Sequence, residues 1–151
     1  MIKKVIIEIS CYAFVILFTY AAISKLIDLR LFKAQVSQSP LLIDHAEAIV
    51  WLVPIAELLI SGLLLIPKTR LVGLYLSFGT MVAFTTYIIA ILKFSDYVPC
   101  SCGGILSSMG WTSHLVFNLA FVLLAIIAIW TMHKEQNESP ETLRNLTEKL
   151  S

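Results

Sequence analysis

The most reactive side chains of this sequence are two thiols, Cys100 and Cys102, which stand one residue apart in the stretch VPCSCGG. Thiols at this spacing could exchange disulfides, bind a metal or brace a turn. An oxidised pair would close a ring of about eleven atoms, which requires Cα atoms within about 7 Å and a kinked backbone. Pro99 before the pair and Gly103 and Gly104 after it favour that kink. Because strained, exposed disulfides are the more oxidising and labile ones, the spacing favours exchange.

Two other interpretations of the pair stay open. A structural disulfide stabilises mainly by closing a long loop of the unfolded chain, and this one would close almost none. Thiolates also suit Cu(I) and Zn(II), and we expect three further candidate ligands on the same side of the membrane: His45, Asp96 and His114. This set lacks the ligand spacing of a structural zinc site, so we assign no metal ligand. The alternative to exchange is thus a non-catalytic membrane scaffold or assembly subunit, or a Cu/Zn-binding membrane protein.

The composition is that of a membrane protein. Of the 151 residues, 58% are hydrophobic and only 14% are charged, and the mean hydropathy is +0.87. Water-soluble domains carry about 25% charged residues. The net charge of +1 and the scattered Lys and Arg residues offer no basic surface, which argues against nucleic acid as a partner. The partner that the composition predicts is a lipid bilayer.

Four stretches are long and apolar enough to cross a bilayer, whose hydrocarbon core needs about 20 residues per helix. We expect spans at residues 5–24, 46–66, 71–92 and 113–132, with an extracytoplasmic loop at 93–112 and a polar tail at 133–151. Pro67 closes the second span, Pro99 follows the third, and Pro140 favours a separate short helix in the tail. The predicted fold class is all-α, an integral membrane four-helix bundle.

The distribution of Lys and Arg predicts the orientation of this bundle. Seven of these residues fall on the side that holds both termini, namely Lys3, Lys4, Lys68, Arg70, Lys134, Arg144 and Lys149. Four fall on the other side, namely Lys25, Arg30, Lys33 and Lys93. By the positive-inside rule both termini are cytoplasmic. The loop with the cysteine pair then faces the periplasm or the exterior, where disulfides persist, and the expected location is a bacterial inner membrane.

Glu57 is the most informative residue outside the loop. It falls about eleven residues into its span, where a carboxylate requires a partner, a proton or a polar cavity. Lys25 is a candidate partner, but helical rise places it about 10 Å or more from the level of Glu57. Glu57 could instead take part in proton or quinone chemistry, or tether helices through one of four polar side chains: Thr85, Thr86, Tyr87 or Asn118.

Thiol exchange also requires a base or a field that stabilises the thiolate. Residues 103–109 could form a helical turn whose N-terminus does this, and His114 could accept the proton if the loop folds back over it. A histidine at a membrane interface can equally be a solvated side chain. The third cysteine, Cys11, falls inside the first span, where a thiol is expected to behave as a small hydrophobe.

Three sequence patterns together resemble the MauE/DoxX-like family of redox-associated membrane proteins. They are SKLID at the end of the first span (residues 24–28), P-x-x-E-L-x-x-x-G in the second (residues 54–62), and C-x-C-G-G before the last (residues 100–104). The resemblance implies a four-helix bundle that assists thiol–disulfide chemistry in exported proteins. It places Cys100 and Cys102 at the family's cysteine motif, and Lys25 and Glu57 at its charged positions.

The expected function is therefore thiol–disulfide exchange at Cys100 and Cys102, with Lys25, Glu57 and His114 in support. The partner would be an exported thiol-containing protein or a thioredoxin-like carrier. Electrons would pass to a membrane quinone, the only cofactor we consider, or to another protein. Electron flow in the opposite direction, in which the cysteine pair reduces its partner, fits the sequence equally well.

Overall fold

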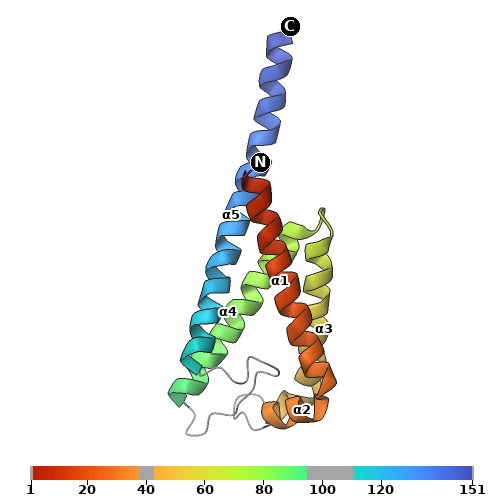
Figure 1. Ribbon diagram of the computed structural model, residues 1–151, viewed down its shortest axis with the longest axis vertical. Coiled ribbons are helices and arrows are strands. Elements are labelled where there is room, and N and C mark those ends of the chain that lie inside the picture. The colour runs from red at the N-terminus through yellow and green to blue at the C-terminus, as the bar shows by residue number, and fades with distance from the viewer. Residues whose placement is uncertain (1, 38–42, 95–110, 151) are drawn as a thin grey trace.

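The computed structural model describes residues 2–37, 43–94 and 111–150, and within them the chain is all-α (Figure 1). The helices are α1 (Ile2–Ile27), α2 (Leu29–Ser37), α3 (Ala46–Leu65), α4 (Arg70–Phe94) and α5 (Trp111–Leu150), and a 3-10 turn, η1 (Ile43–His45), precedes α3. The four long helices each contain a stretch long and apolar enough to cross a membrane. The all-α class and the four predicted spans are confirmed, and the chain is an integral membrane protein with four candidate spans.

The helix ends differ most from the predicted ones in α1 and α5. α1 extends three residues beyond the predicted 5–24 at each end, because the break in the chain falls at Asp28. The Asp28 carboxylate accepts a hydrogen bond from the Leu31 amide at 3.1 Å and so caps α2. α5 continues as one helix to Leu150, although the sequence predicted a separate helix after Pro140. The proline removes one intrahelical hydrogen bond without ending the helix.

The long helices form a bundle in which α1 and α4 each pack against both α3 and α5. α3 and α5 therefore stand diagonally across the bundle. The short helix α2 crosses one end and buries Phe32 and Val36 against Ala46 and Val50 of α3. We call this the α2 end of the bundle. α1 and α4 end there and α3 and α5 begin there, while the last part of α5 projects beyond the opposite end (Figure 1).

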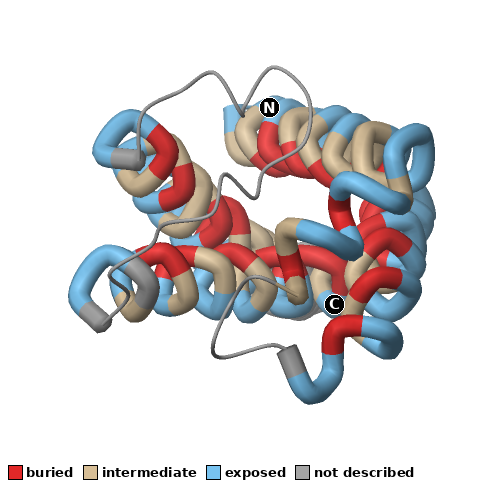
Figure 2. Tube along the Cα trace, turned by 90° about the horizontal axis from the view of Figure 1, so that it is seen from below, coloured by how far each residue is buried: buried red, intermediate tan, exposed pale blue. Residues whose placement is uncertain are grey.

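The apolar core lies away from the α2 end. Its buried members are Ile7, Cys11, Phe14 and Phe18 of α1, Ile60 and Leu64 of α3, Leu74 and Met81 of α4, and Ala125 and Ala128 of α5. Figure 2, seen from the α2 end, shows buried residues on the inward sides of the helices. Large apolar side chains such as Ile16, Leu59 and Leu123 are exposed on the outer faces, as helices surrounded by lipid require. Cys11, only 2% exposed, occupies the apolar position that the sequence predicted.

Candidate functional site

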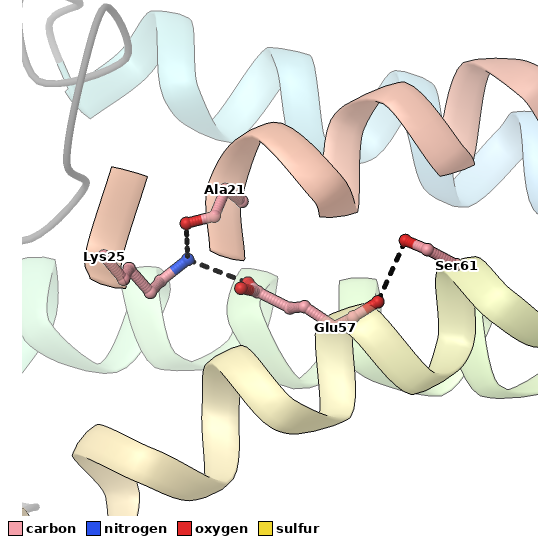
Figure 3. Close-up of polar contacts among 4 residues, drawn as sticks. All are labelled: Ala21, Lys25, Glu57 and Ser61. Atoms are coloured by element: carbon pink, nitrogen blue, oxygen red, sulfur yellow. Dashed lines mark hydrogen bonds and ion pairs between the residues drawn. The ribbon is translucent and has the colours of Figure 1, made fainter. Parts of the chain in front are cut away.

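Lys25 and Glu57 form a buried ion pair between α1 and α3 (Figure 3). The Lys25 Nζ atom donates to Glu57 Oε1 at 2.8 Å and to the Ala21 carbonyl oxygen at 3.2 Å. The Glu57 side chain is 1% exposed and that of Lys25 is 12% exposed. A buried ion pair in a membrane bundle carries a large desolvation penalty, so it is a candidate for a functional role rather than a simple source of stability.

The two side chains meet because α1 and α3 run in opposite directions. In a helix each Cα–Cβ bond tilts toward the N-terminus. Lys25 lies in the last turn of α1 and therefore leans away from the α2 end, toward the bundle interior. Glu57 lies about three turns into α3, which begins at the α2 end, so it leans back toward Lys25. The two lengths of side chain close the gap of about 10 Å that helical rise alone predicts between the two positions.

A second polar contact joins α1 and α3 one turn deeper in the bundle. The Ser61 hydroxyl donates to the Glu57 carbonyl oxygen at 3.0 Å, and the Thr19 hydroxyl donates to the Ser61 oxygen at 3.3 Å. These contacts fix the backbone of α3 around Glu57. Glu57 does not form the alternative tether to Thr85, Thr86, Tyr87 or Asn118, because its Oε1 atom bonds Lys25 and its Oε2 atom has no hydrogen-bond partner among the described residues.

Two buried polar atoms have no hydrogen-bond partner within the described ranges. One is Glu57 Oε2, the carboxylate oxygen that does not contact Lys25, and the other is Asn118 Nδ2. Asn118 is 3% exposed and belongs to α5. Because nearly all buried polar groups in proteins are paired, each of these atoms calls for a physical explanation. The sequence had drawn attention to Asn118 only as one of four candidate partners for Glu57.

His114 is another buried titratable group at this end of the bundle. It occupies the first turn of α5 and is 8% exposed, so the alternative of a solvated side chain is wrong. It lies within electrostatic reach of Lys25. Of the predicted supporting residues, the structure thus joins Lys25 and Glu57 directly and buries His114 near them. Together with Asn118 they make the interior polar at the α2 end, in contrast to the apolar core farther along the bundle.

The sequence of this bundle matches one protein-family model over most of its length. The family model described as methylamine utilisation protein MauE matches residues 3–131. The chain belongs to the MauE family. The match covers all four candidate spans almost completely and stops before the projecting part of α5. The comparisons with curated proteins and with solved structures gave no match.

The two cysteines that the sequence singled out, Cys100 and Cys102, lie inside the MauE match but outside the described residues, as does Asp96. Their segment, 95–110, connects the last residue of α4 to the first of α5, and both of these helix ends are at the α2 end. Within the ranges 2–37, 43–94 and 111–150, no group of three or more His, Cys, Asp or Glu side chains could hold a metal ion. His45 is exposed at the start of α3.

Proposed function

We propose that this MauE-family protein assists thiol–disulfide exchange in exported proteins through Cys100 and Cys102. What carries the proposal is the C-x-C pair in the segment that joins α4 to α5, because those two helix ends lie at the end of the bundle whose interior holds the Lys25–Glu57 ion pair. A dithiol that trades electrons needs polar groups nearby to accept and return protons. The α2 end is where the described residues offer such groups.

We propose the orientation that the Lys and Arg count favours, with both termini in the cytoplasm and the cysteine pair in the periplasm. The pair can then persist as a disulfide. A substrate thiolate attacks one sulfur of the Cys100–Cys102 bond, forms a mixed disulfide and releases the other cysteine as a thiolate. A second substrate thiolate attacks the mixed disulfide. The substrate leaves oxidised, and Cys100 and Cys102 are left reduced by two electrons.

His114 is the described side chain best placed to serve this chemistry as a base. It is buried at the start of α5, a short distance along the chain from the cysteine pair, and it is near the positive charge of Lys25. The neutral imidazole is the form of histidine that accepts a proton. This assignment gives His114 a positioning and proton-accepting role, while Cys100 and Cys102 carry the covalent steps.

Trapping of a mixed disulfide tests the proposal. The full chain is purified in a Cys11→Ala background, oxidised, and mixed with a thioredoxin variant that keeps one active-site cysteine. Because this substrate has no second thiol, the mixed disulfide accumulates and migrates as a covalent adduct on a non-reducing gel. The same chain with Cys100→Ser and Cys102→Ser is the matched control and forms no adduct.

Failure of the oxidised wild-type pair to form an adduct would favour the alternative interpretation, a membrane scaffold or a Cu/Zn-binding protein. The metal content of chain prepared without chelator then separates these two. Stoichiometric copper or zinc that disappears in the Cys100→Ser/Cys102→Ser chain would identify a metal site. Absence of metal from the wild-type chain would favour the membrane scaffold.

A further inference from the structure

The two unpartnered polar atoms, Glu57 Oε2 and Asn118 Nδ2, are chemically complementary. A carboxylate oxygen accepts hydrogen bonds and an amide nitrogen donates them. Each side chain is more than nine-tenths buried, so neither atom has ready access to bulk solvent. Leaving such atoms unpaired lowers stability, and a bound molecule that supplies the missing partner is one physical explanation for them.

Contacts with α1 place both side chains nearer the α2 end than Phe14 is. Glu57 lies one turn closer to the α2 end than Ser61, which contacts Thr19 of α1. Asn118 lies about one turn closer to the α2 end than Phe121, whose ring packs edge-on against Phe14 of α1 at 5.3 Å. Both side chains therefore lie in the layer between the Phe14–Phe121 contact and the α2 end.

Their helices, α3 and α5, are the diagonal pair of the bundle. A donor and an acceptor thus enter the interior from opposite sides and do not bond to each other. A small ligand between them could accept a hydrogen bond from Asn118 and be held on its far side by Glu57.

The surroundings of Asn118 suit a flat, apolar ring. Phe117 and Phe121 lie beside it on α5, with ring centroids 4.8 Å apart, and Phe121 in turn contacts Phe14. Toward the α2 end, a pocket of about 240 Å³ lies against Lys25 and is also lined by Asp28 and Phe32. Lys25 thus lines this pocket and also binds Glu57.

We propose that this layer binds the headgroup of a lipid-soluble quinone, with Asn118 and Glu57 as its polar contacts. The inference rests on the proposed function, which leaves Cys100 and Cys102 as a dithiol that must lose electrons again. The dithiol loses two electrons and two protons as its S–S bond forms. The electrons reduce the quinone ring and the protons bind its two carbonyl oxygens, which gives a hydroquinone. The Asn118 amide donates to a quinone carbonyl. Glu57 Oε2 accepts from a hydroquinone hydroxyl, so the two redox forms depend on different residues.

Photolabelling with an azidoquinone, competed by unlabelled decylubiquinone, tests the site in the full chain in lipid nanodiscs. We expect labelling on α3 or α5. Asn118→Leu should raise the decylubiquinone concentration needed for half-maximal competition about tenfold, as loss of one buried hydrogen bond predicts. Thr131→Val is the matched control on α5, because the Thr131 hydroxyl donates only to the Ile127 carbonyl of its own helix at 2.7 Å. It should compete as wild type does.

The reduced probe, decylubiquinol, examines Glu57 separately. The double variant Lys25→Met/Glu57→Leu removes both charges, so that neither is left buried alone. We expect this variant to lose competition by the quinol and to retain most of the competition by the quinone. Labelling that is not competed in wild type, or competition that Asn118→Leu leaves unchanged, would overturn the quinone site.

The cysteines distinguish failure of this inference from failure of the proposed function. Quinone binding needs no thiol, so the Cys100→Ser/Cys102→Ser chain should label and compete as wild type does. Adduct formation with thioredoxin needs no quinone and should survive Asn118→Leu. Adduct formation without competed labelling would overturn the quinone site alone. Competed labelling without adduct formation would overturn the exchange and, with it, the role of the quinone as electron acceptor.

Discussion

Lys25 of α1 and Glu57 of α3 are joined by a 2.8 Å contact inside a bundle of four apolar helices. The lysine belongs to the last turn of its helix, where a long cationic side chain ordinarily extends outward to water. Here it turns inward and bonds the Ala21 carbonyl as well. The pair links two helices at the end of the bundle to which the cysteine-bearing segment connects.

Removal of one member of this pair should destabilise the protein strongly. Lys25→Met leaves the Glu57 carboxylate buried and uncompensated, and we expect a loss of about 3–5 kcal/mol in the free energy of unfolding. Lys25→Met/Glu57→Leu should recover most of that loss because no buried charge remains. Unfolding of the detergent-solubilised chain, followed by circular dichroism, measures both effects.

The Lys33–Glu47 pair supplies the control for this experiment. It has a similar length, 2.7 Å, but its side chains are 52% and 85% exposed. Lys33→Met should leave the unfolding transition unchanged, because exposed ion pairs are screened by water. Equal effects of Lys25→Met and Lys33→Met would contradict the special position of the buried pair.

Two glycines of α4 should respond in opposite ways to a methyl group. A Cβ atom at Gly73 would lie 2.9 Å from Leu64 Cδ2 and 3.2 Å from the Leu64 amide nitrogen, whereas one at Gly79 would meet nothing within 4 Å. Gly73→Ala therefore crowds the contact between α3 and α4 and should destabilise the fold by about 1 kcal/mol or more. Gly79→Ala should be neutral or stabilising by up to about 1 kcal/mol, because alanine is the better helix former. Thermal unfolding of the two variants compares them directly, and a lower transition temperature for Gly79→Ala than for Gly73→Ala would contradict the packing.

Accessibility of single cysteines determines the orientation. In a chain without native cysteines, Arg30→Cys on α2 and Lys68→Cys in the turn between α3 and α4 lie at opposite ends of the bundle. If the termini are cytoplasmic, a membrane-impermeant maleimide added to intact spheroplasts labels Arg30→Cys at once. It labels Lys68→Cys only after permeabilisation. The reverse pattern would place the cysteine pair in the cytoplasm, where glutathione keeps thiols reduced.

Hydropathy was sufficient to predict the four helices, and the position of a carboxylate near the middle of the second span was sufficient to single out Glu57. The contact between Glu57 and Lys25 was harder to predict, because helical rise measures only the backbone. It omits the opposite lean of side chains on antiparallel helices and the extension of α1 to Ile27. The burial of His114 depends on helix packing that the linear sequence does not contain. The roles assigned to Cys100 and Cys102 stay predictions, since both lie outside the described residues.

The redox behaviour of the Cys100–Cys102 pair tests the central claim most directly. The full chain in a Cys11→Ala background is equilibrated in a series of glutathione buffers of graded reduction potential. Free thiols are then alkylated with a mass tag. We predict a reversible two-electron transition near the periplasmic poise in folded protein, absent from the Cys100→Ser and Cys102→Ser variants. A pair that never oxidises, or that resists reduction until the protein unfolds, would contradict the account.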